Sequence, residues 1–251
     1  MKITDGIYLV GGGDIGLSNK MDCHVYLLDG GEKKCLIDSG IGLQSRIILE
    51  NIKEEGFDPK NDLDYLLISH AHADHAGGAK DIYSETGAEV IAPQGEAQFI
   101  EKGGKDLDEG LRACIRAGVY PTNYKYRHVN VRRTVRHNTR LKVGKYHLRV
   151  IQIPGHSHAT AGFLIEEEPR CFFSSDIVFV QGTIGLGNWP GCSLDNYRKY
   201  IDRLGGLRVV SLFPGHYIWT LVDGQSHLDT AISNMSSPWV PPSWGHNHPL
   251  R

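Results

Sequence analysis

The segment SHAHADHAGG, residues 69–78, limits the fold more than any other part of the chain, because it holds four metal-binding side chains within six positions. It follows the run DYLLIS, a short apolar stretch typical of a buried strand. In extended backbone, residues two apart point to the same side, so His70 and His72 can share one metal ion. A turn into a helix at the following glycines would direct Asp74 and His75 to another side of the same cavity. The segment therefore predicts two ligand sets at the end of a buried strand.

Further candidate ligands stand at the ends of later strand-like runs, where loops leave the edge of a sheet. They are His156 in QIPGHSHAT, Asp176 in CFFSSD and His216 in SLFPGHY. Asp38, in CLIDSG, has the same position after a strand. Because metal ligands are commonly oriented by hydrogen bonds to neighbouring carboxylates, we expect Asp38 to orient ligands and not to bind a metal itself.

Short apolar runs that end in Gly, Asp or Pro recur along the chain and predict strands. These strands cover residues 7–10, 24–30, 33–40, 64–69, 88–93, 147–155, 161–167, 170–176 and 208–216. Amphipathic patterns predict helices over residues 43–56, 77–88, 93–103 and 194–206. This order favours an α/β fold with two helix-covered sheets over one doubly wound parallel sheet. We expect a single domain over residues 1–251, with a tail rich in Pro and Trp over residues 237–251.

Taken in order, DSG at 38–40, the histidine motif at 70–75, PGH at 154–156, Asp176 and PGH at 214–216 resemble the metallo-β-lactamase fold superfamily. The resemblance runs from about residue 7 to residue 216. It implies a four-layer αββα sandwich that carries a two-metal site.

The resemblance also implies which side chains hold each ion. The first ion would be held by His70, His72 and His156. The second would be held by Asp74, His75 and His216, and Asp176 would bridge the two. This set of imidazoles and carboxylates fits two Zn²⁺ ions most simply, with iron or manganese as alternatives.

Differences between this sequence and individual subfamilies indicate which members of the superfamily it resembles most. True β-lactamases of this fold usually lack an aspartate at the position of Asp176, which makes the chain more similar to glyoxalase II, lactonases and related hydrolases. Glyoxalase II carries a basic glutathione-binding domain, which we do not find in this sequence. Quorum-signal lactonases carry a tyrosine shortly after the bridging aspartate, whereas Phe179 and its neighbours offer none. We expect a glyoxalase II-like or lactonase-like metallohydrolase of this superfamily.

The function that the resemblance implies is dinuclear metal-dependent hydrolysis. A hydroxide bridging the two metal ions would attack an ester, thioester, lactone or amide carbonyl of a small molecule. Asp74 would anchor the second ion and pass a proton to the leaving group. Tyr217, next to His216, would donate a hydrogen bond to the substrate oxyanion, although a packing role accounts for it equally well.

Three alternatives stay open. A mononuclear iron oxidoreductase similar to persulfide dioxygenases would use His70, His156 and Asp176. A phosphodiesterase or ribonuclease-type hydrolase would favour a basic surface, and residues 127–145, with seven Lys or Arg and no acid, offer one. A solvated hairpin face explains those residues as well. A binding protein with a degenerate site ranks last, because every predicted ligand position still carries a side chain that can bind a metal ion.

Composition limits the partners and the location. The formal net charge is −2, and no run approaches the roughly 18 apolar residues of a membrane span, so we expect neither nucleic acid nor a membrane as partner. The five scattered cysteines predict reduced thiols, and the N-terminal residues lack a signal-peptide core. We therefore expect a cytoplasmic location and a small-molecule substrate, with a homodimer as an open alternative.

Substrate specificity in such a fold lies in loops, whose shape one sequence does not fix. The relevant segments are residues 11–22, 101–130, 181–191 and the tail. Trp189 is a candidate substrate wall. His158 is expected in a loop without binding metal, and His246 and His248 are expected at the surface.

Overall fold

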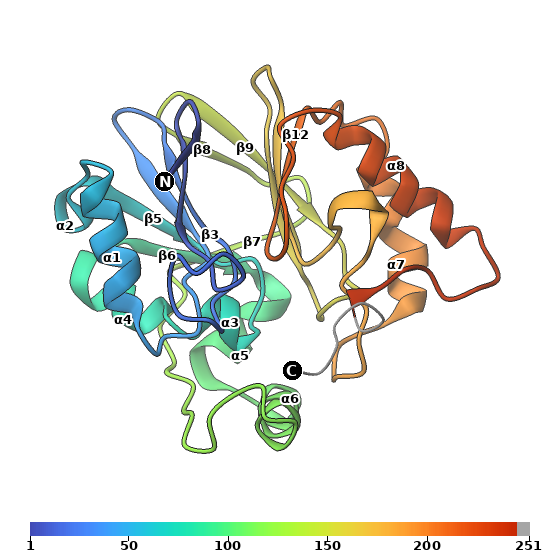
Figure 1. Cartoon of the computed structure of the whole chain (residues 1–251), viewed down its shortest axis with the longest axis horizontal. Helices are drawn as coiled ribbons and strands as arrows, with labels where there is room; N and C mark the ends of the chain where they lie inside the picture. Colours follow the sequence, from blue (N-terminus) through green and yellow to red (C-terminus); the bar gives the residue numbers. More distant parts are fainter. Residues whose placement is uncertain (245–251) are drawn as a thin grey trace. The chain divides into compact units, whose positions relative to one another are not determined.

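The computed structural model of the chain describes residues 1–244, which form two compact units. Unit 1 comprises Met1–Val135 and Lys142–Tyr146, and unit 2 comprises Arg136–Leu141 and the chain from His147 onward. Each unit is built around one β-sheet, which confirms the prediction of two sheets (Figure 1). The expectation of a single domain over residues 1–251 stays a prediction, and His246 and His248 lie outside the described residues.

Unit 1 holds a seven-stranded sheet in the order β1-β2-β3-β4-β5-β6-β7. Strands β1 to β4 pair antiparallel, whereas β4 to β7 pair parallel. The strands are β1 (Lys2–Thr4), β2 (Ile7–Gly11), β3 (Val25–Asp29), β4 (Lys34–Ile37), β5 (Leu63–Leu67), β6 (Glu89–Pro93) and β7 (Arg133–Val135). The helices are α1 (Ser45–Glu54), α2 (Pro59–Asp62), α3 (Ala73–Ala76), α4 (Ala79–Thr86), α5 (Gln94–Lys102) and α6 (Lys105–Arg116).

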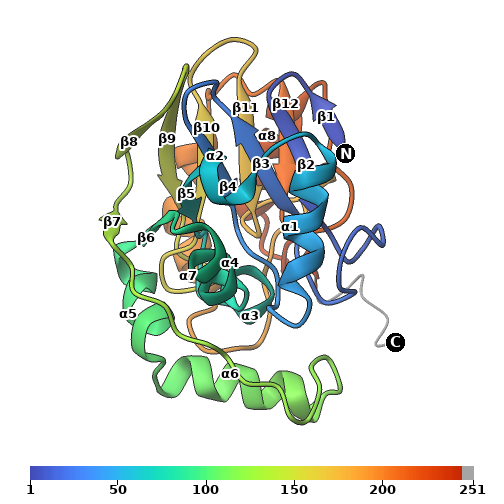
Figure 2. The ribbon, with the colours of Figure 1, turned by 90° about the vertical axis from the view of Figure 1, so that its left-hand side faces the viewer.

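Helices α1 and α4 cover one face of this sheet (Figures 1 and 2). Ile48 and Ile52, four residues apart on α1, and Ile82 on α4 face the sheet, as the amphipathic pattern predicts. They pack with Val25 and Leu27, which are two apart on β3 and therefore share a face. The parallel strands of unit 1 are thus held on this face by a continuous apolar core.

Unit 2 holds a five-stranded sheet in the order β12-β11-β10-β9-β8. Strands β9, β10 and β11 pair antiparallel, and β11 pairs parallel with β12. The strands are β8 (Arg140–Val143), β9 (Tyr146–Gln152), β10 (Ala161–Ile165), β11 (Cys171–Ser175) and β12 (Ser211–Pro214). The helices are η1 (Val180–Gly182), α7 (Leu194–Tyr200), η2 (Ile201–Leu204) and α8 (Gly224–Met235). Leu228 and Ala231 of α8 share an apolar cluster with Phe172 of β11 and Leu212 of β12.

All nine predicted strands and all four predicted helices are present, with shifts of a few residues at their ends. Residues 101–130, expected above to be one of the loops, are not a loop throughout. The segment contains α6, whose apolar spacing is interrupted by Gly110 and preceded by Gly103 and Gly104. Within residues 127–145, β7 pairs with β6, and β8 neighbours β9, which begins directly after the segment.

One further helix was not predicted. Helix α8 begins at Gly224 and carries several Ser, Thr and Asn residues, which are weak helix formers, so its pattern was not recognised. Tail residues 242–244 lie beside Ile184, with backbone bonds from Ile184 to Pro242 and from Trp244 to Ile184. Among residues 1–244, none of the helices combines the length and apolar character that crossing a membrane requires.

Two glycines, Gly110 in the interior of α6 and Gly118 just beyond its end, provide a test of the backbone. A methyl group added at either Gly110 or Gly118 would meet no atom within 4 Å, but only Gly118 has a positive φ, of 74°. We expect Gly110→Ala to raise the free energy of unfolding by about 0.5–1 kcal/mol, because the helix interior disfavours glycine by that amount. Gly118→Ala should lower it by about 1 kcal/mol, because alanine is strained in the left-handed region. Urea unfolding of both variants checks this, and equal effects would contradict it.

Candidate metal centre

The parallel pairing of β4 with β5 places one group of polar residues at a single sheet edge in unit 1. Asp38 follows β4 directly, and Ser69 and His70 follow β5. Because parallel strands end at the same edge, residues that follow them are brought together. Asp38 has a positive φ of 62°, which turns its carboxylate toward the end of β5.

The buried carboxylate of Asp38 orients two of the predicted ligands. It accepts bonds from the backbone N–H of Ser69 at 2.7 Å, from the Ser69 hydroxyl at 2.8 Å and from Nδ1–H of His75 at 2.8 Å. Since the Ser69 hydroxyl donates to Asp38, it must accept from Nδ1–H of His70, 2.9 Å away. With its proton on Nδ1, each imidazole in its neutral form has Nε2 as the electron-pair donor, which is the tautomer that a metal ion requires.

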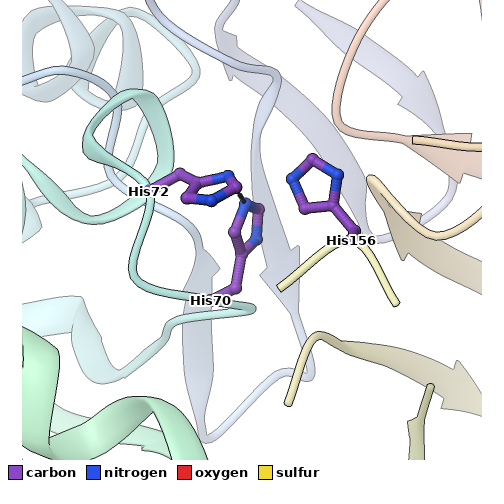
Figure 3. Close-up of side chains that lie close together, drawn as sticks. All are labelled: His70, His72 and His156. Atoms are coloured by element: carbon purple, nitrogen blue, oxygen red, sulfur yellow. Dashed lines mark hydrogen bonds between the residues drawn. The ribbon is translucent and has the colours of Figure 1, made fainter. Parts of the chain in front are cut away.

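The histidine motif is placed much as its pattern predicted. His70 and His75 are fully buried, and Nε2 of His70 lies 3.0 Å from Nδ1 of His72 (Figure 3). His72 is the extended residue that precedes α3, and Asp74 and His75 lie within that one-turn helix. Oδ2 of Asp74 is 3.8 Å from Nε2 of His75. Unit 1 alone thus presents two pairs of ligand atoms.

Unit 2 brings its own three predicted ligands together. Asp176 follows β11, and His216 follows β12, the parallel neighbour of β11. His156 follows β9, which runs in the same direction as β11 because β10 is antiparallel to both. Oδ2 of Asp176 lies 3.4 Å from Nε2 of His156 and 3.7 Å from Nε2 of His216. All three side chains are buried, and His156, the third member of Figure 3, is fully so.

The segment after Asp176 holds His156 in place. Nδ1–H of His156 donates to the backbone oxygen of Gly185 at 2.6 Å, which leaves Nε2 as the electron-pair donor. A Cβ at Gly185 would lie 2.1 Å from the backbone oxygen of Asp176, so only glycine permits this approach. The Trp189 indole donates to the His156 carbonyl at 2.8 Å, and its ring meets the imidazole edge-on at 5.2 Å. Trp189 is therefore next to a predicted ligand, and its role as a substrate wall stays a prediction.

Aromatic rings also surround His216. The ring of Trp244, in the described part of the tail, lies 4.6 Å from the His216 imidazole. Trp244 also meets Tyr217 at 6.2 Å and Phe179 at 6.0 Å. Tyr217 has a positive φ of 65°, and its ring packs edge-on against Phe179. The structure thus places Tyr217 beside the predicted ligands in a packed cluster, and its role in catalysis stays a prediction. His158 is exposed.

Several residues at the site were missed from the sequence. Buried Glu96 of α5 accepts the backbone N–H of Ala71, between His70 and His72, at 3.0 Å. The Tyr197 hydroxyl donates to the backbone oxygen of Asp176 at 3.1 Å. The Tyr120 hydroxyl donates to Oδ1 of Asp74 at 3.1 Å. Each contact joins segments that are distant in sequence, so no local sequence pattern indicates it.

The described residues fit metal ions on the chemistry and spacing of their donors. Two donors bound 2.0–2.1 Å from one tetrahedral ion lie about 3.3 Å apart. The separations within each unit, 3.0 to 3.8 Å, are close to this value. A third group in unit 1, formed by Cys23, Asp38 and His75, also lies within 4.8 Å. Burial raises the pKa of the Cys23 thiol, which disfavours the thiolate that a metal would need.

Comparison with known proteins identifies the family. The sequence profile of the metallo-β-lactamase superfamily matches residues 19–216, and the chain belongs to that superfamily. It is 25% identical to a beta-lactamase-like protein 2 homolog of Caenorhabditis elegans, over 86% of this chain and 62% of that protein. It is 24% identical to the lactamase-like protein aptB of Emericella nidulans, over 85% of this chain and 57% of that protein. The chain therefore spans about three-fifths of the length of these relatives.

Solved structures show the same fold. A metallo-β-lactamase family protein from Thermus thermophilus matches with a TM-score of 0.73 and 21% identity, covering 94% of this chain and 81% of that one. A subclass B3 metallo-β-lactamase of Bradyrhizobium japonicum matches with a TM-score of 0.69 and 21% identity, covering 93% and 89%. The predicted αββα fold class is confirmed. The predicted enzyme class, a metallohydrolase of this fold, stays a prediction.

Asp38→Asn tests whether this carboxylate sets the tautomer of its neighbours. An amide nitrogen in place of Oδ2 would donate to Nδ1 of His75 and move the imidazole proton to Nε2. We expect affinity for zinc to fall about 10–100-fold, the usual effect of losing such a partner. Competition with a chromophoric chelator measures it. Asp58→Asn, at the exposed N-terminus of α2 where Asn caps equally well, should leave zinc affinity unchanged. An unchanged affinity in the Asp38 variant would contradict the role given to this carboxylate.

Proposed function

We propose that this protein is a dinuclear metal-dependent hydrolase that cleaves an ester, thioester, lactone or amide bond of a small molecule. In this proposal the ligand sets of the two units hold one common pair of ions. His70, His72 and His156 would hold the first ion. Asp74, His75 and His216 would hold the second, and Asp176 would contact both.

The observation that carries the proposal is the position of the Asp176 carboxylate within unit 2. A single oxygen, Oδ2, lies near Nε2 of His156 and also near Nε2 of His216. These histidines are assigned to different ions, so an oxygen between them is where a bridging ligand would be needed. Asp74 and His75 in unit 1, placed beside each other in α3, support the second ion. A mononuclear iron centre would need neither of them.

The chain's own residues would orient the ligands and the substrate. Two bound metal ions would supply a water acidic enough to attack at neutral pH and would polarise the substrate carbonyl. Asp38, Ser69 and the Gly185 carbonyl accept hydrogen bonds from Nδ1–H of three imidazoles, those of His75, His70 and His156. These bonds leave Nε2 of each ring as the atom that would bind a metal ion. The Tyr217 hydroxyl would donate to the developing oxyanion of the substrate, and Asp74 would return a proton to the leaving group.

The surroundings of the ligands support a small organic substrate over a nucleic acid. The half-buried rings of Trp189 and Trp244 offer apolar surface next to His156 and His216. In the basic segment 127–145, several charges are compensated, since Arg127, Arg133 and Arg140 form ion pairs with Asp81, Glu89 and Glu166. A phosphodiester backbone would require free positive charge instead. Zinc as the metal, the cytoplasmic location and a homodimer stay predictions.

The test combines metal analysis with a panel of ester, thioester, lactone and amide substrates. We expect two metal ions per chain, and loss of hydrolysis on metal removal with recovery on adding zinc. His70→Ala and Asp176→Ala should lower kcat/KM by more than about 100-fold, because losing a ligand should cost more than losing an outer partner. His147→Ala, which removes an exposed imidazole paired with Glu167, should have no effect.

Other outcomes would favour other functions. Full activity in metal-stripped protein would contradict metal-dependent hydrolysis. A single iron per chain, with oxygen uptake in the presence of a persulfide, would favour the oxidoreductase alternative. Cleavage of phosphodiesters but of no carbonyl substrate would favour the nuclease alternative.

A further inference from the structure

The segment that follows α6 delivers a tyrosine hydroxyl to a predicted metal ligand. Tyr120 lies four residues beyond the end of α6, and only 8% of its surface is exposed. Its hydroxyl donates to Oδ1 of Asp74 at 3.1 Å. Asp74 Oδ2, the other oxygen of that carboxylate, is the one that lies 3.8 Å from Nε2 of His75. The tyrosine therefore contacts one oxygen of the carboxylate, and the other oxygen is the one paired with His75.

We propose that Tyr120 is a positioning residue for the second metal ion, which holds the Asp74 carboxylate so that Oδ2 is presented beside His75. The inference rests on the proposed function, because it takes Asp74 as a ligand of that ion. A carboxylate on a short side chain can rotate about its last bond, and a donor fixed on one oxygen removes that freedom. Metal affinity is then gained because the ligand is already oriented before the ion binds.

The position of Tyr120 is itself fixed by packing. Its ring lies 5.4 Å from that of Tyr124, and both belong to an apolar cluster with Ile41 and Ala73. Leu111 and Ile115 of α6 pack against the same cluster. Ala73 directly precedes Asp74, so one cluster holds both the donor and the backbone of its acceptor. The inference gives α6 a role that its sequence did not suggest: it anchors the segment that carries the hydroxyl.

Tyr124 supplies a matched control. It is a second tyrosine of the same cluster, but its hydroxyl donates to the backbone oxygen of Ile41, at 2.9 Å, and does not bond to a ligand. Tyr120→Phe and Tyr124→Phe each delete one hydroxyl and keep the ring. Any general effect of losing a buried hydrogen bond in this cluster should appear in both variants, whereas an effect through Asp74 should appear only in the first.

The experiment is a zinc titration of the full chain against a chelator, with the ions bound per chain determined by elemental analysis. We expect Tyr120→Phe to bind the first ion as the wild type does and the second about 10–100-fold more weakly. Tyr124→Phe should bind both ions as the wild type does. Thermal melting of the metal-free proteins reports any general loss of stability, which a structural role would produce without separating the two ions.

The outcomes distinguish the inference from the proposed function. A wild type that binds two ions and a Tyr120→Phe variant that binds both equally well would overturn the inference alone. Equal weakening of both ions, or a variant too unstable to bind either, would also overturn it, because the role would then be structural. A wild type that binds only one ion would overturn the dinuclear centre of the proposed function.

Discussion

The parallel pairing of two pairs of strands is the constraint on which the candidate site depends. In unit 1, β4 and β5 end at one edge, and in unit 2, β11 and β12 do the same. Asp38 and the histidine motif leave the first edge, and Asp176 and His216 leave the second. Strand positions are fixed by backbone hydrogen bonds and by the apolar cores on the sheets, so these loops begin at rigid points. A shift of register by one residue in either pair would separate side chains that now lie within 4 Å.

Burying so many polar groups is costly, and the hydrogen-bond pattern shows how the cost is limited. Asp38 and Asp176 are almost completely buried, as are His70, His75 and His156. The carboxylate of Asp38 offsets its lost hydration with three hydrogen bonds, two of them from Ser69. The imidazoles of His70, His75 and His156 each donate Nδ1–H to an oxygen of the chain. A metal ion bound among such groups would compensate the remaining negative charge, so stability and metal binding are thermodynamically linked.

The predicted ligand positions could be recognised in the sequence because each one follows a strand whose apolar run is clear. His156, Asp176 and His216 could be found in this way without any knowledge of contacts in space. A residue that orients a predicted ligand could be recognised from the sequence only where it also follows a strand, as Asp38 does. Tyr120 and Glu96 act through contacts between distant segments, and neither stands in a pattern of its own. Helix α6 was missed because glycines precede and interrupt it, although its apolar residues do pack on one cluster.

The rings around His156 and His216 lie in segments that the strand pattern of the sequence does not determine. Trp189 lies in the loop 181–191 and Trp244 in the tail, and neither is fixed by a strand of the sheet. The tail is tied to Ile184 by backbone bonds, so it is coupled to the same segment whose Gly185 carbonyl orients His156. A change of side chain at these rings alters the surface next to the ligands while the strand-end positions stay unchanged. The strand-end positions are therefore determined by the periodic part of the sequence, whereas the surrounding surface and the orientation of His156 depend on the same loop segment.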